Sequence, residues 1–226
     1  WPNTVQLGSV VDVKAENLPQ IDILLAGSPC QGFSSAGKGL NFEDPRSKLF
    51  FEFVRLLKEC QPKYFLLENV KMKKEYETVI TNILRVAPIK INSSLVSAQN
   101  RERLYWTNVP NIQQPADKGI KLSNILENLP FDRAYYIDNF KQHSPVFYKQ
   151  DKYKCLVAQG GGRTKERAIC DENKNWRHLS RNEGESLQTV DQNYTSPVSV
   201  NQAFKCLGNG WTVDVIAHIL KGIPQQ

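Results

Sequence analysis

The sequence predicts an α/β protein with a mostly parallel sheet, because strand-like and helix-like segments alternate along its first half. A short apolar run, 21–27, is closed by glycine and proline and is typical of a buried strand. Residues 46–60 then carry apolar side chains at helical spacing. A second apolar run, 62–70, follows directly, and this order favours two parallel strands joined by a crossover helix.

The next segments extend this alternation with less regular patterns. Residues 73–86 predict an amphipathic helix, and residues 89–96 and 104–108 predict two strands that pair antiparallel at a sheet edge. Residues 123–129 predict a short helix with Ser123 as its N-cap. Residues 131–176 are polar, aromatic and basic, and they predict a small loop-rich lobe. A closing helix is expected over 212–220, entered from the Gly-Asn-Gly at 208–210.

Length and composition exclude several classes of protein. A chain of 226 residues that is 40% hydrophobic has enough apolar surface for a core, which excludes wholesale disorder. No apolar run approaches the roughly 18 residues of a membrane span, so we expect a soluble, cytoplasmic protein without membrane contact. The five cysteines form no Cys-x-x-Cys pair, so we expect neither a zinc cluster nor a disulfide framework. The chain begins at Trp1, and we expect it to be a processed or partial product.

The positive charge is concentrated in one segment. The formal net charge is +6, and residues 141–181 hold ten lysines and arginines against four acidic residues. A localised basic segment is the pattern expected of a surface that contacts a polyanion, and a solvated basic surface is the alternative.

Three motifs carry reactive side chains, and each lies at the end of a predicted strand or beside one. Cys30 follows the first strand, where reactive groups of open α/β sheets gather, although a lone cysteine is more often a small buried residue. Glu68 begins the Glu-Asn-Val that ends the second strand, and its carboxylate is expected to face the same edge as Cys30, where burial would raise its pKa and suit it to proton donation. Arg101 and Arg103 lie on one side of an extended segment and suit a carbonyl, carboxylate or phosphate, with a charged edge strand as the alternative.

Taken in order, these motifs resemble the signature of the cytosine-C5 DNA methyltransferases. The matching blocks are Pro-Cys-Gln at 29–31, Glu-Asn-Val at 68–70, Gln-x-Arg-x-Arg at 99–103, Arg-His-Leu-Ser to Leu-Gln-Thr at 177–189 and Gly-Asn-Gly-Trp-Thr-Val at 208–213. Only residues from about 110 to 175 lie outside the likeness, in the family's variable target-recognition region. The set most resembles bacterial or phage modification enzymes, with some likeness to the animal de novo branch.

The resemblance implies a doubly wound methyltransferase sheet whose first strands are missing from this sequence. It implies a catalytic core at 1–110, a small target-recognition region at 111–176, and a segment at 177–226 that returns to the core. The blocks depart from the family at 181–182, where Arg-Asn replaces the usual proline-containing turn.

The resemblance also assigns the chemistry. A cytosine of double-stranded DNA flips out of the helix, and Cys30 attacks its C6 atom. Glu68 holds N3 and the exocyclic amine, Arg103 holds the O2 carbonyl, and Arg101 supports the thiolate or its loop. The activated C5 atom then takes the methyl group of S-adenosylmethionine.

Further residues are matched to the cofactor and to DNA. The positions matched to the cofactor site are Ser9, Val10, Pro29, Leu49, Asn209 and Trp211. The expected DNA contacts are Gln31, Ser34, Ser35, Lys38, Gly160, Gly161, Gly162, Arg163 and Lys165, and we also expect Lys149, Lys152, Lys154 and Arg167 on the DNA-facing side.

Half of the family's cofactor site is absent from this sequence, and Ser9 stands where an aspartate is usual. We therefore expect negligible cofactor binding by this chain alone until an upstream segment or a second subunit supplies the missing strands; otherwise we expect a monomer.

Three alternatives stay open. The first is a truncated or inactive DNA-binding module. The second is an unrelated thiol enzyme, which would need a histidine beside Cys30. The third is an RNA-directed variant, although the Cys-Phe-Thr signature of that branch is not found.

Overall fold

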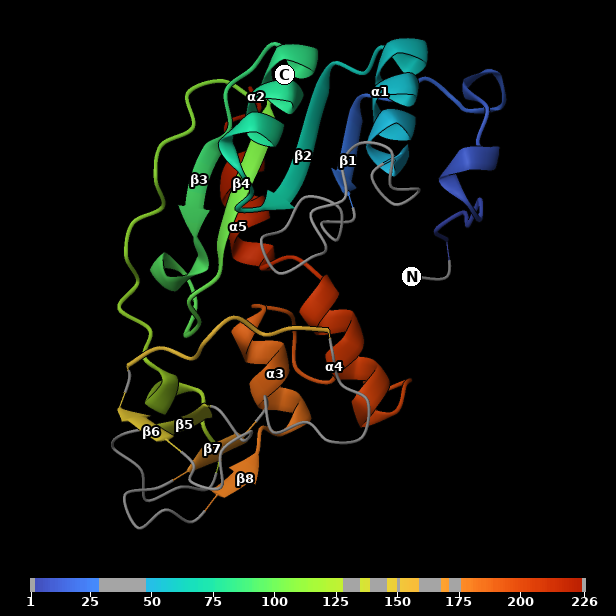
Figure 1. Cartoon of the computed structure of the whole chain (residues 1–226). Coiled ribbons are helices and arrows are strands. Elements are labelled where there is room, and N and C mark those ends of the chain that lie inside the picture. Colours follow the sequence, from blue (N-terminus) through green and yellow to red (C-terminus); the bar gives the residue numbers. More distant parts are fainter. Residues whose placement is uncertain are drawn as a thin grey trace. The chain divides into compact units, whose positions relative to one another are not determined.

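The chain forms two compact units in a computed structural model (Figure 1). The structure describes residues 3–28, 48–127, 135–138, 146–149, 151–158, 168–170 and 176–224. Unit 1 comprises Trp1–Ile91 and Glu102–Asn111, and unit 2 comprises Asn92–Arg101 and Ile112–Gln226. Each unit is therefore assembled from two separate stretches of sequence.

Unit 1 contains a four-stranded sheet of order β1-β2-β4-β3. Its strands are β1 (Ile23–Gly27), β2 (Tyr64–Val70), β3 (Ile89–Asn92) and β4 (Glu102–Thr107). β1 runs parallel to β2, whereas β4 runs antiparallel to β2. The described sheet is therefore mixed, and the two segments expected at its edge are neighbours there.

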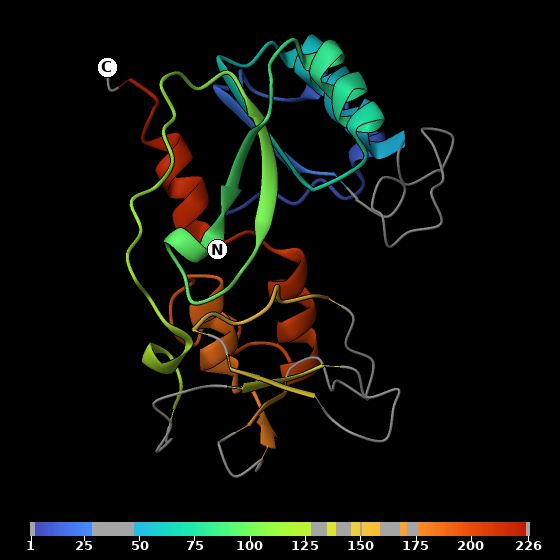
Figure 2. The same ribbon diagram turned by 60° about the vertical axis from the view of Figure 1, so that its left-hand side comes forward.

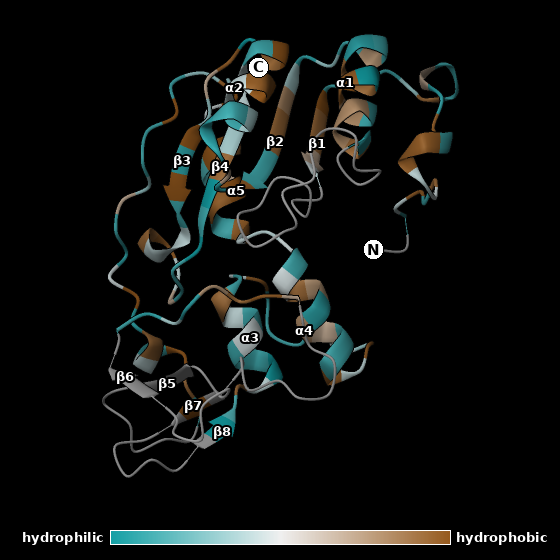
Figure 3. Cartoon of the chain, viewed as in Figure 1, coloured by the Kyte–Doolittle hydropathy of each residue, from teal (hydrophilic) through white to brown (hydrophobic). Residues whose placement is uncertain are grey.

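Two helices cover one face of this sheet, as Figure 2 shows. α1 (Lys48–Cys60) connects β1 with β2, and α2 (Lys74–Leu84) connects β2 with β3. Phe50 and Phe53 of α1, Ile80 of α2, Leu67 of β2 and Trp106 of β4 belong to one core and are each at most 4% exposed. Because side chains alternate along strands, residues next to Leu67 and Trp106 face away from these helices. Figure 3 shows β1 as hydrophobic along most of its length and α1 as mixed.

Within the described residues, unit 2 contains a second four-stranded sheet and three α-helices. Its strands, in the order β6-β5-β7-β8, are β5 (Tyr135–Asp138), β6 (Val146–Lys149), β7 (Ala168–Cys170) and β8 (Trp176–His178), and every neighbouring pair is antiparallel. The helices are α3 (Arg181–Leu187), α4 (Val200–Asn209) and α5 (Val213–Leu220). A loop-rich lobe was expected over 131–176, so these strands correct that expectation in part.

The observed helix starts differ from the sequence predictions at two places, and one further helix was not predicted. Residues expected to start a helix at Ser123 instead form a short 3-10 helix, η4 (Leu122–Asn124), whose N-cap is Lys121. The Asn124 side chain accepts a hydrogen bond from the Lys121 backbone at 2.7 Å, which places the helix start before Ser123. The Arg-Asn sequence at 181–182 forms the first turn of α3, because Ser180 and Glu183 make a reciprocal capping box there. The sequence did not predict α4.

Three more short 3-10 helices complete the described elements: η1 (Val10–Asp12), η2 (Ala15–Asn17) and η3 (Ser93–Leu95). None of the helices in the described ranges combines the length and the hydrophobicity that crossing a membrane requires.

Candidate active site

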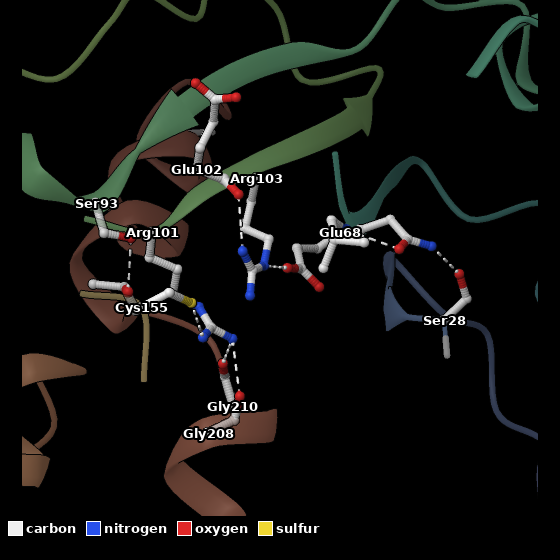
Figure 4. A network of polar contacts seen from close by, with 12 residues as sticks. Ser28, Glu68, Ser93, Arg101, Glu102, Arg103, Cys155, Gly208 and Gly210 are labelled. Carbon is white, nitrogen blue, oxygen red and sulfur yellow. Dashed lines mark hydrogen bonds and ion pairs between the residues drawn. The ribbon is translucent and has the colours of Figure 1, made fainter. Parts of the chain in front are cut away.

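The first part of the candidate site is an ion pair between Glu68 of β2 and Arg103 of β4. Arg103 Nε lies 3.0 Å from Glu68 Oε1, and the two side chains are only 14% and 11% exposed (Figure 4). The strand register explains the contact: Glu68 is opposite Tyr105, so Arg103 is its diagonal neighbour on the same face. This face is the one that points away from α1 and α2. Arg103 Nη1 also donates to the Glu102 carbonyl at 2.8 Å, which fixes the guanidinium further.

The second part lies where β1 ends beside β2. Gly27, the last residue of β1, is the parallel neighbour of Glu68. The Asn69 amide is 1% exposed and donates to the Ser28 hydroxyl at 2.8 Å, while its carbonyl accepts from the Val70 backbone. Ser28 is thereby held directly before the segment that carries Cys30.

That segment, 29–47, lies outside the described residues. It includes the expected nucleophile and several expected cofactor and DNA contacts, namely Cys30, Pro29, Gln31, Ser34, Ser35 and Lys38. These assignments stay predictions.

Arg101 has a different environment from Arg103, although the two are separated by a single residue. Its side chain belongs to unit 2 and is 4% exposed. Nη1 donates to the Leu156 carbonyl at 2.9 Å and contacts Cys155 Sγ at 3.3 Å. Nη2 donates to the carbonyls of Gly208 at 3.2 Å and Gly210 at 2.8 Å (Figure 4). Arg101 therefore contacts the backbone around the end of α4, which its sequence motif did not indicate.

A buried polar network surrounds Arg101 in unit 2. Gln99 Nε2 donates to Gln188 Oε1 at 2.9 Å, and Gln188 Nε2 donates to the carbonyls of Leu207 and Gly210. The Thr212 hydroxyl also contacts Gln188 Oε1 at 2.9 Å. All three polar side chains are at most 1% exposed. Hydrogen bonds thus join motifs that lie about 90 to 110 residues apart in the sequence. The sequence motifs gave no role to the side chains of Gln99 and Gln188, which stabilise this network.

The residues matched to the cofactor are distributed over both units. In unit 1, Ser9 is exposed, while Val10 of η1 and Leu49 of α1 are half-buried. Arg55 of α1 holds this region by donating to the carbonyls of Val10 at 3.2 Å and Val13 at 2.8 Å.

In unit 2, Asn209 is exposed and Trp211 is half-buried. An adenosyl ligand needs apolar surface for its ring and polar tips for its hydroxyl and amino groups. Ser9 with Val10, and Asn209 with Trp211, each pair an accessible polar side chain with a partly buried apolar one. Their residue types therefore fit such a ligand.

The basic segment is less available to a polyanion than its charge suggests. Lys152 Nζ donates to the carbonyls of Ser94 at 2.6 Å, Ser97 at 3.1 Å and Ile120 at 2.5 Å. Burial lowers the pKa of the Lys152 ammonium group, and this effect exceeds the opposing attraction of nearby aspartates. We expected Lys152 on the DNA-facing side, and in the structure its ammonium group donates to three backbone carbonyls of unit 2.

Two arginines of the same segment are also bound internally. Arg177 forms a two-pronged ion pair with the fully buried Glu183, with contacts of 2.5 and 2.8 Å, and this hydrogen bonding raises the arginine's pKa. Arg181 donates to the carbonyls of Thr195 and Val198. Lys154 is half-buried. The side chain of Lys149 in β6 is not described, and Gly160, Gly161, Gly162, Arg163, Lys165 and Arg167 lie outside the described residues.

Comparison with known proteins gives several curated relatives. The chain is 33% identical over 250 residues to the Type II methyltransferase M1.ScrFI of Lactococcus lactis subsp. cremoris, covering 94% of this chain and 64% of that protein. It is 29% identical over 268 residues to the Type II methyltransferase M.HpaII of Haemophilus parainfluenzae, covering 95% of this chain and 75% of the relative. The chain thus spans less than two thirds of the length of M1.ScrFI.

Two solved structures share the fold. One is described as a DNA modification methyltransferase encoded within an E. coli prophage, with a TM-score of 0.60 at 19% identity over 96% of this chain and 84% of that one. The other is the S. pombe Dnmt2 methyltransferase, with a TM-score of 0.64 at 15% identity over 97% of this chain and 85% of that one. The expected α/β methyltransferase fold is confirmed by these likenesses.

The family described as C-5 cytosine-specific DNA methylase matches residues 1–109 and 72–225, which together span nearly the whole chain. The Glu68–Arg103 pair and the network around Arg101 both lie within these matched ranges. On this evidence the chain is a member of the C-5 cytosine-specific DNA methylase family.

Proposed function

We propose that this chain carries the catalytic core of an S-adenosylmethionine-dependent methyltransferase that modifies C5 of cytosine in double-stranded DNA, as part of a bacterial or phage modification system. The observation that carries the proposal is the Glu68–Arg103 pair, held at 3.0 Å on one sheet face beside the end of β1. The names of the relatives, which are Type II methyltransferases, support the reaction class.

The pair suits one edge of a cytosine ring. On that edge the carbonyl O2, the ring N3 and the exocyclic amine follow one another, so a guanidinium beside a carboxyl group can bind them side by side. Arg103 donates to O2, and Glu68 contacts N3 and the amine. A base reaches such a site only after it has flipped out of the duplex. The limited exposure of both side chains strengthens these interactions, because little water competes for them.

The proposed reaction begins when the Cys30 thiolate attacks C6 of the bound cytosine. The C6–S bond forms and the C5–C6 π electrons move into the ring. Arg103 stabilises the negative charge at O2, and a proton donated by Glu68 to N3 neutralises the ring, which leaves C5 nucleophilic. S-adenosylmethionine, when bound, supplies the electrophilic methyl group. After C5 is methylated, water takes the C5 proton, and the electrons of that C–H bond re-form the C5–C6 double bond. The C6–S bond breaks with its electrons on sulfur, which regenerates the Cys30 thiolate, and N3 returns its proton to Glu68. Arg101 is bound to backbone in unit 2 and has no step of its own.

The residues proposed to hold S-adenosylmethionine are Ser9, Val10, Pro29, Leu49, Asn209 and Trp211. Arg55 acts on this set indirectly, since it binds the Val10 carbonyl.

We propose in addition that a further polypeptide segment, in cis or as a second subunit, pairs with the free edge of β1. Within the described residues β1 pairs with β2 alone, and Leu25 in the middle of β1 is 37% exposed. Val5, Leu7 and Val11 of the same unit are 54 to 78% exposed. Parallel strands are usually covered on both faces, so this apolar edge favours an additional partner strand. Cofactor binding depends on that segment; apart from it the protein acts as a monomer in the cytoplasm, where its DNA substrate lies.

Mechanism-based trapping tests the proposal. The full-length protein, S-adenosylmethionine and duplex DNA containing 5-fluorocytosine are expected to form a covalent complex, because fluorine at C5 cannot leave as a proton does. Cys30→Ser is expected to abolish the complex, whereas Cys60→Ser, a change at the end of α1, retains it. A complex formed by Cys30→Ser at normal yield would overturn the assignment. DNA binding without any trapping by the unaltered protein would instead indicate an inactive DNA-binding module.

A further inference from the structure

The turn formed by residues 208–212, which are the last two residues of α4 and the three residues before α5, is held from within unit 2 by two long polar side chains. Arg101 donates to the carbonyls of Gly208 and Gly210, and Gln188 donates to the carbonyl of Gly210 and to that of Leu207 one residue before the turn. Both side chains are at least 96% buried. The turn is therefore fixed through its backbone, by side chains that come from distant parts of the sequence.

These contacts complete the carboxyl end of α4. The last carbonyls of a helix lack partners within the helix and carry partial negative charge. A buried guanidinium supplies both hydrogen-bond donors and the favourable charge at that position. Arg101 also binds the Leu156 carbonyl, so it joins the end of α4 to the chain at 155–158.

The packing at Gly208 shows how tightly this end is held. A Cβ atom at Gly208 would lie 2.3 Å from the carbonyl carbon of Val157 and 2.4 Å from the backbone nitrogen of Ala158. Backbone atoms of α4 and of residues 157–158 therefore approach as closely as glycine allows. This contact and the hydrogen bonds from Arg101 both oppose displacement of the turn.

Asn209 and Trp211 alternate with the residues whose carbonyls are bound. Asn209 is exposed and Trp211 half-buried, so their side chains remain accessible while the carbonyls of Gly208 and Gly210 are taken up inside. We infer that Arg101 and Gln188 are positioning residues that set Asn209 and Trp211 for the methyl donor. This inference rests on the proposed function for the identity of the ligand. In this inference Arg101 acts on binding of the methyl donor, whereas the family resemblance assigned it to support of the Cys30 thiolate or its loop.

The test uses the full-length protein labelled with 5-fluorotryptophan, in the absence of any ligand. Trp211→Phe identifies the Trp211 fluorine resonance, and Trp106 in the core of unit 1 serves as an internal reference. Arg101→Met and Gln188→Leu are expected to shift or broaden the Trp211 resonance and to leave that of Trp106 unchanged. Arg101→Lys keeps the positive charge but loses the two separate Nη donors of the guanidinium group. This variant is expected to fold and to shift the Trp211 resonance less than Arg101→Met does.

The second measurement is binding of S-adenosylmethionine by calorimetry, together with steady-state kinetics. The Arg101 and Gln188 variants are expected to raise the donor's Kd and KM by about tenfold or more, because misplacing binding groups by a fraction of an ångström is costly. The value of kcat at saturating donor is expected to change by less than about threefold. Arg103→Lys gives the opposite pattern, a loss in kcat with donor Kd retained.

The outcomes separate the inference from the proposed function. An unchanged Trp211 resonance in Arg101→Lys and Gln188→Leu overturns the positioning role. A changed resonance with unchanged donor Kd overturns the link to the donor. If kcat falls and donor Kd stays constant in the Arg101 variants, Arg101 acts on the base side and the inference is wrong. If the unaltered protein binds the donor but transfers no methyl group, the proposed function fails while the inference is still decided by Kd and the resonance.

Discussion

Arg103 of β4 and Glu68 of β2 contact each other at 3.0 Å across a diagonal of the antiparallel pair. A buried ion pair of this kind adds little to stability, because removing both charges from water costs about as much as their attraction returns. The ion pair instead fixes the orientation of both side chains, because each one holds the other in place before any substrate binds. Under the proposed function the pair is a preorganised recognition element, and mutation of it is expected to change activity more than folding.

Single-turnover methylation tests that distinction. Arg103→Lys and Glu68→Gln are expected to lower the rate by about 10² to 10³, the usual effect of losing one preorganised group that stabilises developing charge. Glu102→Gln is a matched control on the same strand, because its side chain is 36% exposed and pairs with Lys90 at 3.6 Å. A rate within threefold of the unaltered protein for Arg103→Lys would exclude the guanidinium from the chemistry.

The basic segment contains lysines with contrasting expected roles. Lys152→Met is expected to lower the free energy of unfolding by about 1 to 3 kcal/mol, because three partly buried carbonyls lose their donor. It leaves the salt dependence of DNA binding unchanged. Lys165→Gln is expected to flatten the slope of log affinity against log salt by about one unit, with little effect on unfolding. Urea unfolding and a salt titration measure both, and a reduced slope in Lys152→Met would return that residue to the DNA surface.

The free energy of unfolding is expected to depend on the protonation of Glu127 at acidic pH. Hydrogen bonds from Ser180 and Asn182, with the charge of Arg177, lower the pKa of Glu127 below its usual value of 4.5. A lowered pKa in the folded state contributes stability above that usual value, and the contribution is lost as the pH falls through the folded pKa. Glu127→Gln is therefore expected to cost less than about 1 kcal/mol near pH 7 and nothing at strongly acidic pH.

Urea unfolding between pH 3 and 7, taken from about 4.5 downward in small steps, measures this difference. Asn182→Ala removes one of the hydrogen bonds, at 2.8 Å, and is expected to show part of the same pH dependence. A difference between the proteins that grows toward acidic pH would contradict the sign of the shift.

Two glycines in unit 2 should differ in their tolerance of a methyl group. Gly208→Ala places Cβ within 2.5 Å of three backbone atoms, which cannot rotate away. Gly184→Ala meets the ring of Phe204 at 2.7 Å, and a side chain can adjust. We expect Gly208→Ala to destabilise by about 3 kcal/mol or more and Gly184→Ala by less. Thermal unfolding measures both, and equal losses would mean that the 157–158 backbone moves freely.

Hydrophobic periodicity predicted the elements of unit 1 well, because those strands and helices bury whole faces. β1, β2, α1 and α2 lie within the ranges that their apolar patterns indicated. β5 to β8 are only three or four residues long and lie in a polar segment, so no period is visible in them. α4 was missed because the glycine-rich block at 208–210 was taken as the entrance to the closing helix. In the structure Gly208 and Asn209 form the last turn of α4.

Side-chain partners were harder to predict than elements. Glu68 was expected at a strand end, and the register with β4 then determines its contact with Arg103. Arg101 was expected on the same side as Arg103, but β4 begins at Glu102, so strand alternation does not extend to Arg101. Charge counting likewise could not show that Lys152 and Arg177 bind groups inside unit 2, because such contacts join residues up to 58 positions apart.

Several buried or partly buried side chains of unit 2 form hydrogen bonds with its backbone. Arg101, Gln188 and Lys152 all donate to carbonyl oxygens, which every amino acid provides in the same place. Substitution of the residues that offer those carbonyls therefore leaves the acceptors intact, as long as the path of the backbone is kept. A region organised in this way can diverge in its surface side chains without redesign of its scaffold.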